Sequence, residues 1–343
     1  MPPLRLALLL LLASFLGIAL TGTALLAALE GFEATGHRLE TLNGLALFGS
    51  WAIWACTVIP QGQRWSALLP SPQAPGPWRL SGVLMGSNLL NLALPGPVGE
   101  LGAAWFLRRR YGVPLALALA STLLGRVLAL LVFVTVTLLC WPFLSVPETT
   151  AHWLQPLCLL LFLGGLALLP LLIAPQWLLH TLSRVLSSLP FGQRFLPRIR
   201  WWLDCFSQLG HLGPRRWLRA LGWSLVNTLL LGCSGYLCFS ASGASVSLLG
   251  SVFIQSLTAV ASVAAILIPS GLGAVDITFV GAFPAIAQGN LGDAVLCATT
   301  LRLIQIATLF CGVPAVPILL AQLVTQPGAT VAQLQSELLR SEI

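Results

Sequence analysis

Two acidic residues in apolar surroundings are each followed, at one fixed distance, by an isolated arginine. Glu100 precedes Arg126 by 26 residues, and Asp276 precedes Arg302 by the same 26 residues. A charge at bilayer depth costs at least about 2.5–3.5 kcal/mol on insertion scales, and it persists where it is paired or functional. Each pair could pin a hairpin to the next helix, or the arginines could contact an anionic headgroup while the carboxylates tune them or take up a proton. The two roles are compatible, and the sequence leaves both open.

A break rich in proline and glycine directly precedes each acidic residue. Exposed backbone groups at membrane depth are tolerated only inside protein or beside a watery cavity, so both breaks are expected to border a cavity. The helix after each break would point its N-terminal N–H groups into that cavity, where they attract a phosphate or a carboxylate. Asn88 and Asn91 would face the same cavity, or would form hydrogen bonds between helices. The candidate substrate-binding residues are Glu100, Arg126, Asp276, Arg302, Asn88, Asn91, Gly96, Gly99, Ser270, Gly271 and Gly273.

The composition requires a membrane environment for the elements that carry these residues. Of 343 residues, 57% are hydrophobic and only 8% are charged, with a mean hydropathy of +0.91. A soluble domain carries roughly 25% charged residues, so a soluble enzyme is excluded, and the excess of apolar residues excludes a disordered chain. All 17 basic residues are arginine. Either the base composition of the genome or a functional need for planar, permanently charged groups could cause this. They flank apolar spans, which favours contact with anionic lipid headgroups over a nucleic-acid partner.

No residue pattern indicates a metal or a cofactor. The 8 cysteines contain no C-x-x-C pair and fall mostly in apolar spans, where they are expected to pack as small apolar side chains. The 4 histidines lack metal-binding spacing, and no phosphate-binding loop for a nucleotide is present.

Six apolar runs are long enough to cross a bilayer, for which about 20 residues are needed. We therefore predict an all-α, polytopic integral membrane protein, a single membrane domain over residues 1–343, with about six full transmembrane helices plus two re-entrant helical hairpins. The first run exceeds a secretory signal core and is expected to remain as an anchor. The last is expected to kink at Pro314 and Pro317. The runs are 6–29, 43–59, 113–140, 154–174, 217–240 and 291–324.

The arginines predict which loops face the cytoplasm. The segment 175–216 holds 6 arginines, counted in the sequence, and reads as basic interfacial helices on the cytoplasmic surface. Residues 60–79 are expected to be a second interfacial cytoplasmic stretch. The loop 141–153 contains Glu148 and no arginine, so it faces outward. Both termini, including the short tail 325–343, are then cytoplasmic, in a multi-pass cell (inner) membrane protein.

The two hairpins are predicted to form an inverted repeat, over about 79–140 and about 246–324. Arginines at both ends of the first hairpin place its ends on the cytoplasmic side. Three full crossings separate the hairpins, so the second opens to the outside, an arrangement by which transporters expose one midplane site to each side in turn. Residues 246–268 are long enough to span completely, and eight spans result if the hairpin arms cross.

These motifs resemble the transmembrane region of the lysylphosphatidylglycerol synthases, the membrane half of the multiple-peptide-resistance factor, in a free-standing form. The resemblance rests on residues 94–100 with 108–112 and Arg126, and on residues 268–276 with Arg302. It implies a lipid flippase. The chain departs from the family pattern in two ways. The second motif usually ends in glutamate, where this chain has Asp276, and no aminoacyl-transferase domain follows the membrane region. Lysine transfer is therefore not expected from this chain.

The leading hypothesis is a non-enzymatic transporter that moves a lipid with a charged or glycosylated headgroup between leaflets. Its partners would be the membrane lipid substrate, the bilayer and a separate lipid-modifying enzyme. One alternative is a membrane enzyme with Glu100 or Asp276 as general base, although a second clustered carboxylate, a nucleophile and a metal set are missing. Another is a scaffold that recruits a separate lipid synthase through its basic segment. Without an ATP motif, movement would be passive, or driven by protons or by membrane potential.

Overall fold

The structure of this protein is a computed structural model, and its regular structure is helical. Among the described residues there are 10 α-helices, two short 3₁₀ helices and no strand, which confirms the predicted all-α fold. The described residues are 2–30, 37–93, 98–144, 146–147, 212–264, 274–287 and 289–315, with isolated positions between 152 and 209. The predicted span 154–174, most of the basic segment 175–216 and the tail 325–343 lie outside them.

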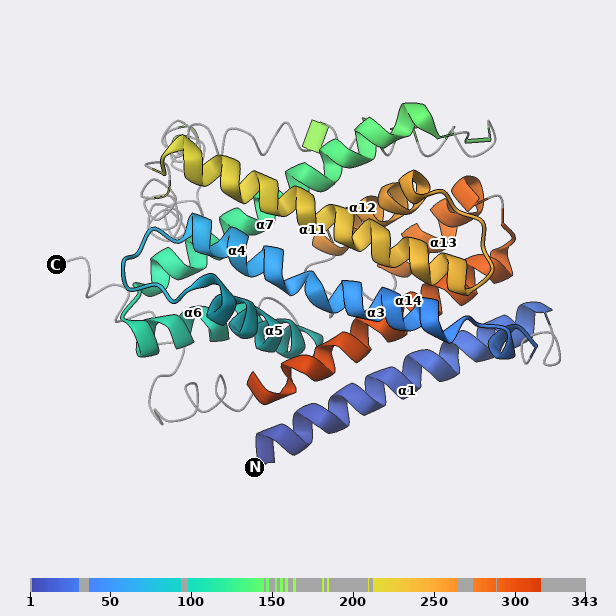
Figure 1. Cartoon of the computed structure of the whole chain (residues 1–343), viewed down its shortest axis with the longest axis horizontal. Coiled ribbons are helices and arrows are strands. Elements are labelled where there is room, and N and C mark those ends of the chain that lie inside the picture. Colours follow the sequence, from blue (N-terminus) through green and yellow to red (C-terminus); the bar gives the residue numbers. More distant parts are fainter. Residues whose placement is uncertain are drawn as a thin grey trace.

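The helices run mainly along the long axis of the molecule (Figure 1). Four described spans are long and apolar enough to cross a membrane, namely Gly44–Leu68, Leu115–Phe143, Pro214–Ala241 and Leu291–Gly312. The helices are α1 (Pro2–Glu30), α3 (Gly44–Cys56), α4 (Val58–Leu68), α5 (Pro77–Ala93), α6 (Val98–Tyr111), α7 (Leu115–Cys140), η1 (Trp141–Phe143), α11 (Pro214–Ala241), α12 (Leu248–Ala264), α13 (Ala274–Ala287), α14 (Leu291–Leu309) and η3 (Phe310–Ala315).

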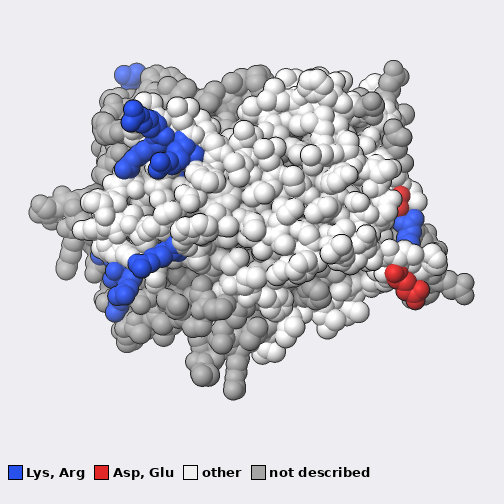
Figure 2. All heavy atoms as spheres, viewed as in Figure 1, with Lys and Arg blue, Asp and Glu red and all other residues white. Residues whose placement is uncertain are grey.

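Charged residues lie at the two ends of the long axis on the face shown in Figure 2, with a broad uncharged band between them. The last turn of α6 carries Arg108, Arg109 and Arg110, at the end where α11 also begins. The opposite end carries the ion pair between Arg38 and Asp293. Large apolar side chains remain exposed along the band, as with Leu45, Phe48, Leu139 and Ile277. An apolar band between charged ends is the surface that a bilayer core requires of a membrane protein.

Two helix pairs, each a longer helix followed by a shorter one, lie toward opposite ends of the bundle. α5 and α6 lie toward the arginine-rich end, whereas α12 and α13 lie toward the other end (Figure 1). Each pair consists of a 17-residue helix followed by a 14-residue helix. At 1.5 Å per residue these are about 26 and 21 Å long, less than the hydrocarbon thickness of about 30 Å. The joining residues 94–97 and 265–273 lie outside the described residues.

The expectation that the second span ends at Ile59 was wrong. Thr57 follows α3 and precedes α4 in the right-handed helical region of backbone space, with φ −62° and ψ −22°, so the chain stays helical as one 25-residue span. Pro60 is tolerated because it is the third residue of α4, where no intrahelical N–H bond is required. Residues 60–68, expected at the membrane surface, therefore lie within the bundle, and Arg64 lies there with them.

Helix α4 packs against α5 through Gly62, and this contact can be tested. A methyl group on Gly62 would meet Ser81 Oγ and would lie 2.8 Å from both Pro77 O and Ser81 N, which are backbone atoms that cannot rotate away. We expect Gly62→Ala to lower the free energy of unfolding by about 1–3 kcal/mol, as overpacking does. Gly82→Ala on α5 is the matched control, because nothing lies within 4 Å of its added methyl. Equal melting temperatures of the two purified variants in detergent would contradict this packing.

Candidate functional site

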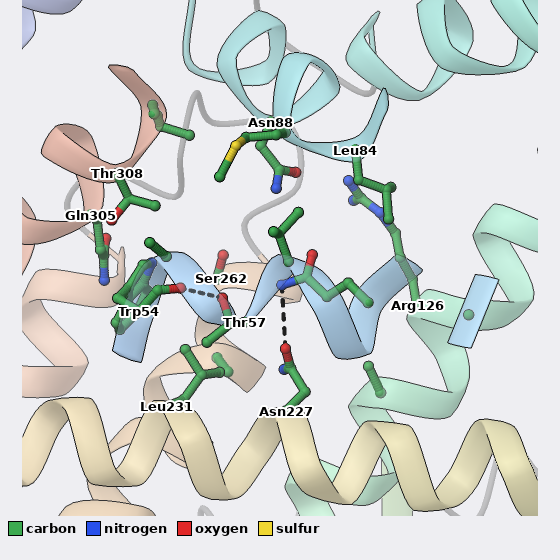
Figure 3. Close-up of a pocket in the computed structure, with 18 of the residues that line it drawn as sticks. Trp54, Thr57, Leu84, Asn88, Arg126, Asn227, Leu231, Ser262, Gln305 and Thr308 are labelled. Carbon is green, nitrogen blue, oxygen red and sulfur yellow. Dashed lines mark hydrogen bonds between the residues drawn. The ribbon is translucent and has the colours of Figure 1, made fainter. Parts of the chain in front are cut away.

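A cavity of about 430 Å³ lies inside the bundle, between helices from both halves of the chain. Its walls come from α1, α3, α4, α5, α6, α7, α11, α12, α13 and α14. Arg126 reaches into it from α7, Asn88 faces it from α5, and Asn227 and Leu231 of α11 form the opposite wall (Figure 3). The polar or charged lining residues include Thr57, Gln61, Arg64, Asn88, Glu100, Ser121, Thr122, Arg126, Asn227, Gln255, Thr258, Ser262, Arg302, Gln305 and Thr308.

The first predicted pair is formed at this cavity. Glu100 Oε1 accepts from Arg126 Nη2 and, at 3.0 Å, from Asn91 Nδ2. The carbonyl oxygen of the same Asn91 side chain accepts from the backbone N–H of Gly99 at 2.7 Å, so one of the N–H groups left without an intrahelical partner at the start of α6 is satisfied. A side chain on Gly99 would collide with the backbone carbonyl of Ser87. Gly99 therefore permits the close approach of α5 and α6 that brings Asn91 to Glu100.

The second predicted pair is also formed, with more regular geometry. Arg302 donates from Nε to Asp276 Oδ1 at 2.7 Å and from Nη2 to Oδ2 at 3.2 Å, and its Nη1 donates to Gln305 Oε1 at 3.1 Å. This two-point contact uses both carboxylate oxygens, which gives the pair a fixed geometry. Asp276, with the shorter side chain, reaches the arginine that the sequence assigned to it.

Each pair occupies equivalent positions in its helices. Glu100 is the third residue of α6 and Asp276 is the third residue of α13, where the partial positive charge of a helix N-terminus favours a carboxylate. Arg126 is the twelfth residue of α7, and Arg302 is the twelfth residue of α14. The fixed spacing of 26 residues therefore reflects a repeated arrangement of two helices and not a chance distance in sequence.

The two pairs differ in which partner is buried. The Glu100 side chain is 10% exposed and that of Arg126 31%, whereas the Arg302 side chain is 10% exposed and that of Asp276 34%. All described contacts of Glu100 fall on Oε1, so its buried Oε2 has no hydrogen-bond partner among the described residues. A buried carboxylate oxygen without a donor is costly. The first pair is therefore the less satisfied of the two.

Several cavity residues were not predicted, and Arg64 is the most important of them. It donates from Nη1 to Ser224 Oγ at 3.4 Å, while Gln61, one turn earlier, donates to Asn227 Oδ1 at 3.3 Å. Thr57, Gln61 and Arg64 recur at intervals of 4 and 3 residues, which places them on one face of a helix. This polar face could have predicted that Arg64 lines the cavity. The prediction was not made because the residues after Pro60 were assigned to the membrane surface.

The other predicted residues divide into two groups. Asn88 lines the cavity, and Asn91 supports Glu100 from the side. Gly96, Ser270, Gly271 and Gly273 lie outside the described residues. Within the part of the chain that the structure describes, no three His, Cys, Asp or Glu side chains are grouped so that they could hold a metal ion.

A comparison with family models identifies residues 8–313 as a lysylphosphatidylglycerol synthase TM region. The chain belongs to this family. The match begins in α1 and ends in η3, so this TM region includes both ion pairs and the whole cavity wall. The resemblance inferred from the two motifs is confirmed, and membership implies a membrane function related to lipids. No curated protein matches the chain.

The buried pair of this TM region should contribute far more to stability than a surface pair. Asp276→Ala leaves the nine-tenths buried Arg302 without its carboxylate, and we expect the free energy of unfolding to fall by about 3 kcal/mol. Arg38→Ala is the matched control, because it breaks an ion pair whose side chains are 30% and 27% exposed, worth at most about 1 kcal/mol. Thermal melting in detergent measures both.

Removing both charges of the pair provides a second check. Asp276→Ala combined with Arg302→Leu leaves no buried charge, and we expect it to recover most of the lost stability. A double variant that melts as low as Asp276→Ala alone would show that the uncompensated guanidinium is not the cause.

Proposed function

We propose that this protein moves a lipid with a charged or glycosylated headgroup between the leaflets of the cell (inner) membrane, without catalysing a covalent reaction. The observation that carries the proposal is the cavity of about 430 Å³, which is lined by Glu100, Arg126 and Arg302 inside a bundle whose exterior is apolar. Charges at this depth are retained at sites that pass or hold polar groups.

The dimensions and surroundings of the cavity suit a lipid headgroup. Ligand pockets in proteins commonly measure about 300–1,000 Å³, so this cavity has room for a headgroup but not for a whole lipid. Large apolar side chains on the outside, such as Leu225 and Leu229 of α11, would keep contact with the acyl chains. The headgroup would cross through the protein while its tails stay in the bilayer.

The two helix pairs support an alternating-access mechanism. They have equal lengths, carry their acids and arginines at equivalent positions and lie toward opposite ends of the bundle. In an inverted repeat of this kind, rocking of one half against the other opens a central site first to one side and then to the other. The arginine-rich end would face the cytoplasm, and both termini with it.

Glu100 is the group that we assign to coupling of transport with protons. Its Oε2 is buried without a donor and could take up a proton, whereas Asp276 has both oxygens bound by Arg302. Protonation of Glu100 would release Arg126 from its ion pair and leave the arginine available to a headgroup. Passive movement and movement driven by membrane potential use the same cavity without this step.

Removal of the two carboxylates tests the proposal directly. Glu100→Gln with Asp276→Asn should abolish translocation, because the carboxylate in the cavity wall and the partner of the lining Arg302 are both neutralised. The assay is run below the melting temperature of the double variant, which loss of the Arg302 ion pair lowers. Asp293→Asn is the matched control, since it neutralises a partly exposed carboxylate at the outer end. The measurement is scrambling of fluorescent phosphatidylglycerol in proteoliposomes, followed by dithionite quenching. Transport by the double variant at the rate of the unmodified protein would refute the proposal.

A further inference from the structure

Arg64 carries a positive charge into the cavity, and no carboxylate among the described residues balances it. Among the described residues it forms no ion pair, and its described hydrogen bond is a long one of 3.4 Å to the Ser224 hydroxyl. Arg126 pairs with Glu100 and Arg302 pairs with Asp276, so Arg64 differs from both other cavity arginines. A half-buried guanidinium in this state lacks part of the hydrogen bonding that it would have in water.

The helix α11 shows how deep Arg64 lies. α11 spans Pro214–Ala241, and Asn227, which bonds to Gln61, is at the middle of this helix. Arg64 contacts Ser224, three residues earlier, which at 1.5 Å per residue is about 5 Å from the middle. An unpaired arginine at such depth opposes membrane insertion, and a functional contact is the usual reason for its retention.

Arg64 and Arg126 are neighbours in the cavity wall. A methyl carbon on Gly125 would lie 3.6 Å from Arg64 Nε, so the Arg64 side chain passes over the residue that precedes Arg126. The two guanidinium groups are close enough to repel each other. Glu100 balances only one of them, so this subsite keeps a single net positive charge when Glu100 is ionised.

We propose that Arg64 and Arg126 together bind the phosphate of a monoanionic glycerophospholipid headgroup. The proposal rests on the transport function above and names its substrate class. A phosphodiester carries one negative charge, which cancels the net charge of the subsite, and the planar guanidinium groups match the spacing of its oxygens. We do not assign phosphate binding to Arg302, because Asp276 and Gln305 already accept hydrogen bonds from three of its N–H groups.

Translocation assays with three lipids test the phosphate site. Fluorescent phosphatidylglycerol has one phosphate anion, phosphatidylcholine has a phosphate neutralised by choline, and glucosyl diacylglycerol has none. We expect Arg64→Gln to slow phosphatidylglycerol about tenfold or more, which is the loss of one hydrogen bond to a charged group. The glucolipid rate should not fall. Arg79→Gln is the matched control, because it neutralises an exposed arginine on α5.

Stability separates this role from a structural one. Arg64→Gln removes a half-buried charge that has no ion-pair partner among the described residues, so its melting temperature should equal or exceed that of the unmodified protein. Loss of a structural arginine would instead leave a less stable variant. Arg64→Lys keeps the charge without the planar fork and should restore part of the phosphatidylglycerol rate. A destabilised Arg64→Gln protein that moves all three lipids more slowly would overturn the proposal.

Ligand-induced shifts of the melting temperature in detergent show whether the site binds a lipid or only free phosphate. They also test phosphate binding separately from transport. Dihexanoylphosphatidylglycerol should raise the melting temperature of the unmodified protein but not that of Arg64→Gln. Stabilisation by inorganic phosphate without any by the short-chain lipid would overturn the assignment to a lipid. If the unmodified protein binds the short-chain lipid but moves no lipid, transport fails and the phosphate site stands. If it moves phosphatidylglycerol and Arg64→Gln does so equally fast, the phosphate site fails and transport stands.

Discussion

The cost of a charge at bilayer depth is the constraint on which this structure depends. An ion-pair partner on another helix offsets this cost, so the two ion pairs also join helices. Arg126 joins α7 to the start of α6, and Arg302 joins α14 to the start of α13. In both cases a carboxylate in the first turn of a short helix meets an arginine in the third or fourth turn of a long one. The short helices are thereby fixed beside the cavity, and their N-terminal dipoles favour the ionised acids.

Close backbone packing makes these contacts possible. Gly99 lets α6 approach α5 so that Asn91 reaches both the Gly99 N–H and Glu100 Oε1. Gly62 has the same effect between α4 and α5, which brings the polar face of α4 into the bundle. Without an apolar driving force between helices in lipid, such small residues and polar contacts provide the association. The glycines and the ion pairs therefore act together, because the glycines provide the proximity that the charges need.

The sequence predicted the pairs but not the whole cavity, for a physical reason. Glu100 with Arg126 and Asp276 with Arg302 could be predicted because a charge in an apolar run stands out, and a repeated interval links two such charges. Arg64 could not, because it follows Pro60, and a proline after an apolar run predicts the end of a helix. The structure shows that the span continues, because the backbone at Thr57 is helical. Pro60 then falls in the first turn of α4, where a proline is tolerated. The depth of Gln61 and Arg64 follows from that local geometry.

The unequal state of the two pairs has a consequence for how one cavity could serve both sides of a membrane. Arg302 binds both carboxylate oxygens of Asp276, so this pair joins α13 to α14 through two hydrogen bonds. Glu100 shares one oxygen between Arg126 and Asn91, and its other oxygen has no donor within the described part of the chain. Arg64 lines the same cavity and forms no ion pair within that part either. A carboxylate with a spare oxygen and a partly exposed arginine can accept further partners more readily than a pair that is bonded at both oxygens. Two helix pairs with an acid and an arginine at equivalent helical positions are thus bonded differently, because one carboxylate uses both oxygens for its arginine and the other uses only one.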